Sequence, residues 1–98
     1  MEKNMKIKTL ETIWTARDNN FKELICATRT FEDLMTYLHE EFYFYDDLEI
    51  HTEGQTIKLK DFLGKDWFKT LKSFDIAKIN HIIKDITIQQ VDLVEMIE

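Results

Sequence analysis

The feature that most constrains this chain is the scarcity of residues that interrupt regular structure. Glycine occurs only at Gly54 and Gly64, and proline is absent. Glycine and proline mark turns and linkers, so a sequence this poor in them offers no boundary between domains. The 98 residues are also too few to build a second hydrophobic core. We therefore expect one globular domain over residues 1–98.

The first third of the chain predicts a β-hairpin. Residues 7–16 are rich in Thr and Ile and favour a strand, although part of this segment also fits helical spacing. Residues 18–20 carry a turn signal, and residues 21–28 resume an extended pattern. Because apolar side chains fall on both faces of the hairpin, we expect it to be central in a sheet or covered on both sides.

The clearest helical pattern follows this hairpin. Thr30 is a typical N-cap, and Asp33 stands three residues later in the position of a capping-box acid. The apolar residues that recur at helical spacing are Phe31, Leu34, Met35, Leu38 and Phe42. The sequence therefore predicts an amphipathic helix that buries these side chains.

A second hairpin is predicted next, and its register follows from the sequence. Glu53 and Gly54 suit a two-residue turn. This turn sets five cross-strand pairs: Thr52 with Gln55, Ile50 with Ile57, Glu49 with Lys58, Leu48 with Leu59, and Asp47 with Lys60. Apolar residues then share one face and opposite charges meet on the other, which stabilises an antiparallel pair.

The last third of the chain is expected to add helical structure and a final strand. Asp66 is a candidate N-cap for a helix over residues 67–74, and residues 75–84 favour a helix although their isoleucines also suit a strand. Residues 86–96 predict a strand with a bulge at residues 89–90. This strand completes the core or, alternatively, leaves an exposed edge that pairs with a second copy.

These elements give the order ββαββαβ. A layered solution for that order is an antiparallel or mixed sheet with helices packed on one face. The sequence therefore predicts an α+β fold.

Acidic residues are concentrated in the middle of the chain. The sequence has 13 Lys plus Arg and 19 Asp plus Glu, a net charge of -6. Residues 30–57 contain no Lys or Arg and eight acids: Glu32, Asp33, Glu40, Glu41, Asp46, Asp47, Glu49 and Glu53. Like charges at helix or strand spacing repel one another, so folding does not require this arrangement. An acidic surface also repels nucleic acid and anionic lipid, which argues against direct binding to either.

The same segment holds an aromatic run, and several of its rings must lie near the surface. Carboxylates with aromatic rings among them suit a basic protein partner. We expect the partner-binding residues to be Asp33, Tyr37, Glu40, Glu41, Tyr43, Tyr45, Asp46, Asp47, Glu49 and Glu53. Lys58 and Lys60 should neutralise part of the strand acids, so the helix and turn acids are the stronger candidates. The alternative is a solvated acidic face without a partner.

The sequence contains no recognisable catalytic or metal-binding motif. The histidines His39, His51 and His81 share no ligand spacing, and a metal site would require them to converge in the fold. The single cysteine, Cys26, cannot form an internal disulfide or a cysteine cluster. We therefore expect a protein that is not an enzyme, with no catalytic residues, no metal and no cofactor.

The overall profile resembles a class of known proteins. Small size, acidic charge, the segment 30–57 and a composition rich in Ile and Lys are similar to those of phage- or mobile-element-encoded inhibitors of nucleic-acid enzymes. This class includes anti-CRISPR proteins, anti-restriction DNA mimics and uracil-DNA glycosylase inhibitors. The resemblance matches no family motif, so it assigns no residue roles.

The resemblance implies an inhibitor that occupies the basic nucleic-acid-binding groove of a nuclease or similar enzyme by charge mimicry. One alternative is a toxin-immunity protein, which shares this profile. Another is a structural or assembly component of a phage or mobile element that self-associates through its C-terminal strand, so the protein is expected to be a monomer or a homodimer. Because the first twenty residues lack an apolar signal-peptide run and no stretch is long enough to span a membrane, we expect a cytoplasmic location in a bacterial host.

Overall fold

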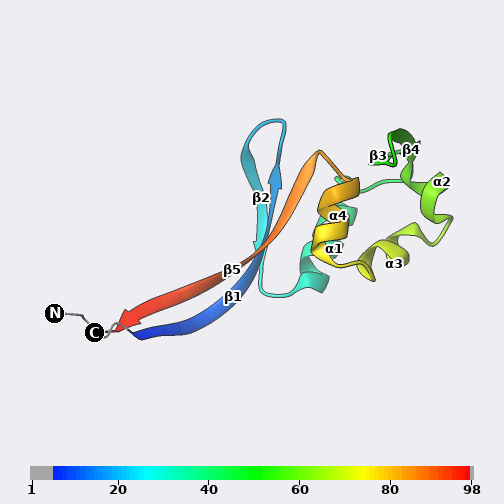
Figure 1. Ribbon diagram of the computed structural model, residues 1–98. Coiled ribbons are helices and arrows are strands. Elements are labelled where there is room, and N and C mark those ends of the chain that lie inside the picture. Colours follow the sequence, from blue (N-terminus) through cyan, green and yellow to red (C-terminus); the bar gives the residue numbers. More distant parts are fainter. Residues whose placement is uncertain (1–5, 98) are drawn as a thin grey trace.

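The computed structural model describes residues 6–97 and has an α+β fold, as expected (Figure 1). The elements are β1 (Lys6–Asp18), β2 (Glu23–Thr28), α1 (Phe31–Glu40), β3 (Glu49–Thr52), β4 (Gln55–Lys58), α2 (Leu59–Leu63), α3 (Trp67–Lys72), α4 (Ile76–Ile82) and β5 (Ile86–Ile97). The molecule is elongated, measuring 58 × 27 × 26 Å. Its length comes from a ribbon of β1 and β5 that extends away from the helices.

The strands form two antiparallel sheets. One sheet has the order β2-β1-β5 and the other consists of β3 and β4. β1 pairs with β5 along almost its whole length, whereas β2 pairs only with residues 14–18 of β1. Residues 6–13 and 91–97 therefore form a two-stranded ribbon that continues beyond the end of β2.

The first hairpin is central only in part, because β1 lies between β2 and β5 whereas β2 is an edge strand of the sheet. It is not covered on both sides: Ala16 is the one fully buried residue of β1. The turn between the strands is longer than expected, and β2 begins at Glu23 instead of at residue 21. The carboxylate of Asp18 stabilises this turn, since its Oδ1 accepts hydrogen bonds from the N–H groups of Asn20 (2.8 Å) and Phe21 (3.2 Å).

The bulge expected at residues 89–90 is wrong. Gln89 and Gln90 pair regularly with Thr15 and Trp14, and the register shifts between Thr9 and Glu11 in the opposite strand. The extra residue is therefore in β1, where the ribbon leaves the body of the protein.

α1 confirms the predicted cap but ends earlier than its apolar pattern. Thr30 Oγ1 accepts a hydrogen bond from the N–H of Asp33 at 3.0 Å. Leu34, Met35 and Leu38 are buried, as expected. The prediction that Phe42 joins this buried face is wrong, because the helix ends at Glu40 and the chain turns before that ring could reach the core.

The register of the second hairpin is confirmed for three pairs: Thr52 with Gln55, Ile50 with Ile57, and Glu49 with Lys58. Glu53 and Gly54 both have positive φ, 49° and 76°, as a tight hairpin turn requires. The two outer pairs of the predicted ladder are wrong, because β4 ends at Lys58 and α2 begins at Leu59. Leu59 still donates its N–H to the carbonyl of Leu48 at 2.8 Å, so the start of α2 remains attached to the loop before β3.

The predicted order ββαββαβ is wrong in its last third, because three short helices, α2, α3 and α4, separate β4 from β5. α3 ends at Lys72, two residues before its predicted end, and Asp66 makes no side-chain cap. Residues 76–82 are helical, as favoured, and Asp75 caps α4 by accepting the N–H of Lys78 at 2.8 Å. The core joins side chains from the helices, from β3 and from the inner end of β5: Leu34, Leu38, Ile50, Leu71, Ile79 and Ile88 are all buried in it.

A candidate acidic and aromatic binding surface

A hollow of about 480 Å³ opens beside the C-terminal end of α1. It is lined by His39, Glu40, Phe42, Phe44, Tyr45, Asp46, Asp47 and Trp67. Four of the ten predicted partner-binding residues, three acids and Tyr45, are therefore brought together by α1 and the loop that follows it. The sequence did not identify the other four lining residues as parts of a site.

Phe42 occupies a backbone position that normally favours glycine. The end of α1 is a Schellman motif, in which Tyr43 donates its N–H to the carbonyl of Leu38 (2.9 Å) and Phe42 donates to that of His39 (3.3 Å). The motif requires a left-handed residue, and Phe42 has a φ of 60° there. The residue is 79% exposed. Neither the conformation nor the exposure favours folding, so this residue is the best candidate for an anchor that contacts another molecule.

The Phe42→Gly variant is expected to be more stable than the wild type by about 1 kcal/mol, because glycine adopts the left-handed conformation without the clash of a Cβ atom. Urea unfolding followed by circular dichroism measures this difference. Phe42→Ala is the matched control, since it removes the ring but keeps the Cβ. Equal stability of the glycine and alanine variants would contradict this prediction.

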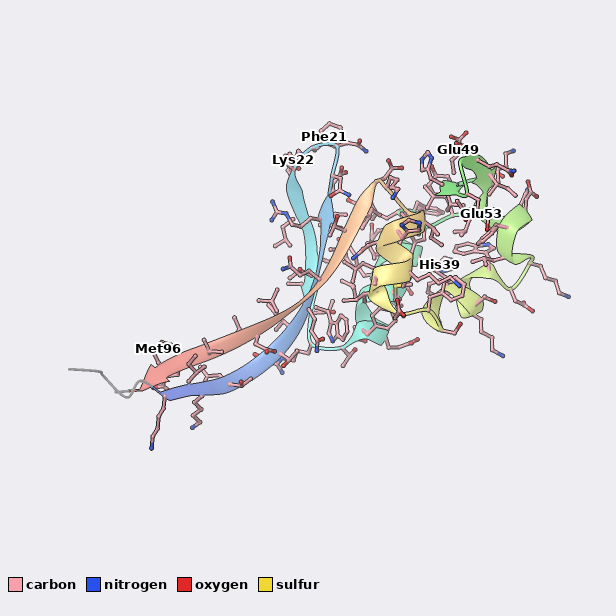
Figure 2. The ribbon with its side chains drawn as sticks, in the orientation of Figure 1. Phe21, Lys22, His39, Glu49, Glu53 and Met96 are labelled. Atoms are coloured by element: carbon pink, nitrogen blue, oxygen red, sulfur yellow. The ribbon has the colours of Figure 1, made fainter. Side chains whose placement is uncertain are left out.

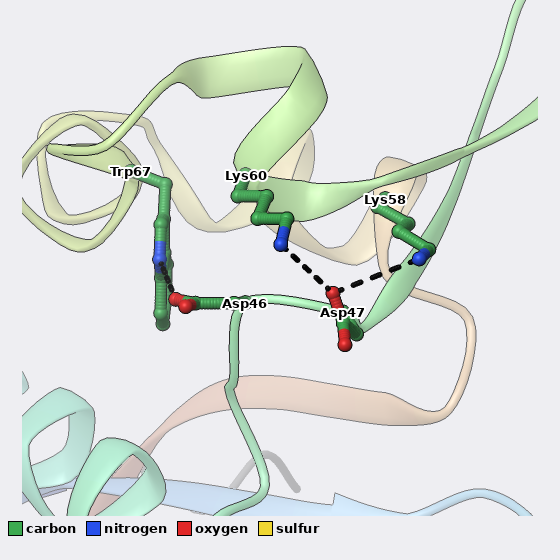
Figure 3. Close-up of polar contacts among 5 residues, drawn as sticks. All are labelled: Asp46, Asp47, Lys58, Lys60 and Trp67. Carbon is green, nitrogen blue, oxygen red and sulfur yellow. Dashed lines mark hydrogen bonds and ion pairs between the residues drawn. The ribbon is translucent and has the colours of Figure 1, made fainter.

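Trp67 forms the buried side of the hollow and is held by an acid. Its Nε1 donates a hydrogen bond to Asp46 Oδ1 at 2.6 Å, and only 5% of the residue is exposed (Figure 3). The His39 ring lies edge-on to Trp67, with 5.5 Å between ring centroids, and stacks on Phe68 at 4.3 Å. Asp46 therefore supports the fold by satisfying a buried indole N–H, in addition to lining the hollow.

Asp47 is partly neutralised by the two lysines identified from the sequence. Its Oδ1 lies 3.4 Å from Lys60 Nζ and 3.8 Å from Lys58 Nζ (Figure 3). All three side chains are substantially exposed, so these ion pairs contribute little to stability. They nevertheless reduce the negative charge that Asp47 can offer to a partner.

The hollow is not lined by the remaining predicted residues on α1 and just after it: Asp33, Tyr37, Glu41 and Tyr43. Partial desolvation and the charge of the nearby Glu41 carboxylate raise the pKa of Tyr37, with smaller contributions from Cys26 and Tyr43. The Tyr37 hydroxyl therefore stays protonated at neutral pH and can donate a hydrogen bond beside Glu41.

The two strand acids do not line this hollow. Glu49 and Glu53 are on the β3–β4 hairpin (Figure 2). Glu53 lines a separate hollow of about 340 Å³, together with His51, His81 and Lys84. The ten predicted residues therefore do not line a single hollow.

Few of the eight acids in residues 30–57 are engaged by cations. Among residues 6–97, lysines pair with two of them, Glu32 and Asp47, and the Glu32 carboxylate lies 3.0 Å from Lys72 Nζ. Within the same residues, Glu40 and Glu41 have no Lys or Arg partner. The negative charge beside Phe42 is therefore available to a basic group from outside.

In the range 6–97, no three His, Cys, Asp or Glu side chains gather as a metal site would require. None of the helices there is long and apolar enough to cross a membrane. No family model, no curated protein and no solved structure matches this chain.

Cys26 should react slowly in the folded protein, because burial raises the pKa of its thiol and the thiolate is the nucleophile. We expect iodoacetamide to alkylate it more slowly in the folded protein than in urea. Since the folded state holds the thiol proton more tightly, the free energy of unfolding should fall as the pH rises from the ordinary thiol pKa of about 8.5 through the raised one. A Cys26→Ser variant with the same alkaline decrease would contradict this assignment.

Proposed function

We propose that this protein binds a basic protein partner through the surface formed by Glu40, Glu41, Phe42, Tyr45 and Asp46, which we call the acidic–aromatic surface. The observation that carries the proposal is the position of Phe42. An exposed ring in an unfavourable backbone conformation stands beside two carboxylates that no lysine or arginine of residues 6–97 engages.

This combination suits recognition of arginine or lysine side chains. Aromatic residues are frequent anchors at the centre of protein interfaces, and exposed carboxylates attract and pair with a basic surface. A guanidinium group can also lie over the face of a Phe or Tyr ring, which adds a cation–π attraction to the ion pair. The hollow beside Phe42 gives such a side chain a place to insert.

A nucleic-acid-binding groove is the partner surface that fits best. Such grooves are rich in Lys and Arg because they bind phosphates, and carboxylates can take the place of phosphates there. The net charge of -6 would steer the protein toward a groove of this kind. We therefore propose an inhibitor that blocks nucleic-acid binding by a partner enzyme, such as a nuclease of a host defence system.

Competition tests this proposal. The partner would be captured on immobilised protein from a nuclease-treated bacterial lysate, identified by mass spectrometry and purified. We expect a nucleic-acid enzyme whose affinity for DNA or RNA falls when this protein is added and recovers with excess nucleic acid. Binding between the two proteins should weaken as salt screens the charges. A captured enzyme that binds nucleic acid equally well in the presence of this protein would overturn the proposal.

A further inference from the structure

The ribbon formed by residues 6–13 of β1 and 91–97 of β5, which we call the arm, lies outside the hydrophobic core (Figure 1). Met96 is near its far end (Figure 2). The arm carries large apolar side chains that are exposed: Ile7, Leu10, Leu93, Val94 and Met96. A two-stranded ribbon is at best marginally stable in water, and stability normally requires three or more strands with a hydrophobic face. The arm therefore lacks the neighbours that would stabilise it.

On the outer edge of β5, the edge that does not pair with β1, the backbone groups of Ile88 form hydrogen bonds with the side chain of Asn80. Asn80 Nδ2 donates to the carbonyl of Ile88, and Asn80 Oδ1 accepts from the N–H of Ile88, each at 2.8 Å. Both backbone groups of Ile88 therefore point away from β1. Backbone groups on the two sides of an antiparallel strand alternate, so the residues that point their N–H and C=O outward in the same way are Gln90, Asp92, Val94 and Met96. Within residues 6–97, no strand pairs with this edge.

We propose that the outer edge of β5 pairs with the same edge of a second copy of this chain, antiparallel about a two-fold axis at Leu93. Two arms would then form one four-stranded sheet, which supplies the strands that each arm lacks. In this register the backbone N–H and C=O of Gln90 form hydrogen bonds with those of Met96 of the second copy. The backbone groups of Asp92 pair in the same way with those of Val94 of the second copy.

The edge itself selects this register. Centring the axis on Leu93 uses all four outward-pointing residues and stops before Ile88, whose backbone groups are already bonded to Asn80. Centring it on Asp92 would place two Asp92 carboxylates directly opposite each other, which is unfavourable. Centring it on Val94 would leave Gln90 without a partner among the described residues of β5.

The charges of the arm are compatible with a second copy. Within its own chain, Asp92 Oδ1 accepts a hydrogen bond from Thr12 Oγ1 at 2.7 Å. Glu95 lies opposite Lys8 in the ladder between β5 and β1. In the proposed register Asp92 lies opposite Val94 of the second copy, and Glu95 lies opposite Val91. The Leu93 side chains of the two copies lie opposite each other. The edge therefore matches itself in hydrogen bonds and apolar contact, and no two carboxylates lie directly opposite each other.

Sedimentation of the full chain from about 1 to about 100 µM tests the proposal, and we expect a dimer. Val94→Pro should weaken the dimer at least about tenfold, because its outward N–H is lost while the bonds to β1 are kept. Val94→Thr is the matched control and should remain dimeric, since it keeps the N–H and the branched Cβ. A wild type that stays monomeric at about 100 µM, or a proline variant that dimerises as well as the wild type, would overturn the proposal.

Cross-linking tests the register without depending on the proline variant. In a Cys26→Ser background, Leu93→Cys would face its own copy in a non-hydrogen-bonded pair, where Cα atoms are about 4.5 Å apart and a disulfide can form. Val91→Cys is the control, because it would lie opposite Glu95 and far from its own copy. We expect rapid disulfide dimer formation for Leu93→Cys alone. Equal rates for the two variants would refute the register. The acidic–aromatic surface shares no residue with the arm, so these results are independent of the proposed function.

Discussion

Replacing Leu38 by alanine is expected to lower the free energy of unfolding by about 2–5 kcal/mol. Leu38 is fully buried in the core that joins α1 to the other helices, to β3 and to β5. The substitution removes its packing contacts and leaves a cavity that the neighbouring side chains fill only in part. A loss of this size is a large fraction of the stability of a small domain, about 5–15 kcal/mol.

Urea unfolding at 25 °C, followed by far-ultraviolet circular dichroism, measures this change. Leu24→Ala is the matched control, because the same side chain is removed from a site in β2 that is 55% exposed. We expect this control to lose less than about 1 kcal/mol. If the two variants lost equal stability, the core would not be centred on α1.

Reversing the charge of Glu40 and Glu41 to lysine is expected to weaken binding to the proposed basic partner by at least about 100-fold. Two attractive charge pairs would become repulsive, and close charge pairs across interfaces are coupled by about 1.5–7 kcal/mol. Asp46 and Asp47 are left unchanged in this variant. Asp46 holds the indole of Trp67, and Asp47 pairs with two lysines, so changes there would alter the fold as well as the surface.

The control for this variant is a second double substitution, Glu49→Lys with Glu53→Lys, on the β3–β4 hairpin. It changes the net charge by the same amount but leaves the hollow beside Phe42 intact. We expect its affinity for the partner to change by no more than about threefold, through long-range charge alone. Isothermal titration calorimetry with the purified partner measures both variants. Equal losses of affinity would assign binding to net charge and contradict the acidic–aromatic surface.

Several local features could be predicted because neighbouring residues determine them. The Thr30 cap depends on one hydroxyl reaching an N–H three residues later, and it is present. The tight turn at Glu53 and Gly54 set the register of the second hairpin, and three of the predicted pairs are present. The acidic residues of the candidate site were also identified from the sequence, since the absence of Lys and Arg over residues 30–57 is a local property.

The role of Phe42 could not be predicted from periodicity. Its spacing continues the apolar pattern of α1, which predicts a buried ring. The helix ends two residues earlier, and nothing in the apolar pattern marks that end, because no glycine occupies the left-handed position. A non-glycine residue at such a position can be found only when the backbone conformation is known.

The sequence by itself determined the α+β class, the cap of α1, the turn of the second hairpin and the charge of residues 30–57. These features depend on residues within a few positions of one another, where side-chain spacing and short hydrogen bonds are sufficient. Only the tertiary structure decided that Trp67 meets Asp46, that Asn80 closes one point on the edge of β5, and that the arm lies outside the core. Those features join segments whose meeting depends on how the whole chain packs, because the same apolar residues could be buried against several different neighbours.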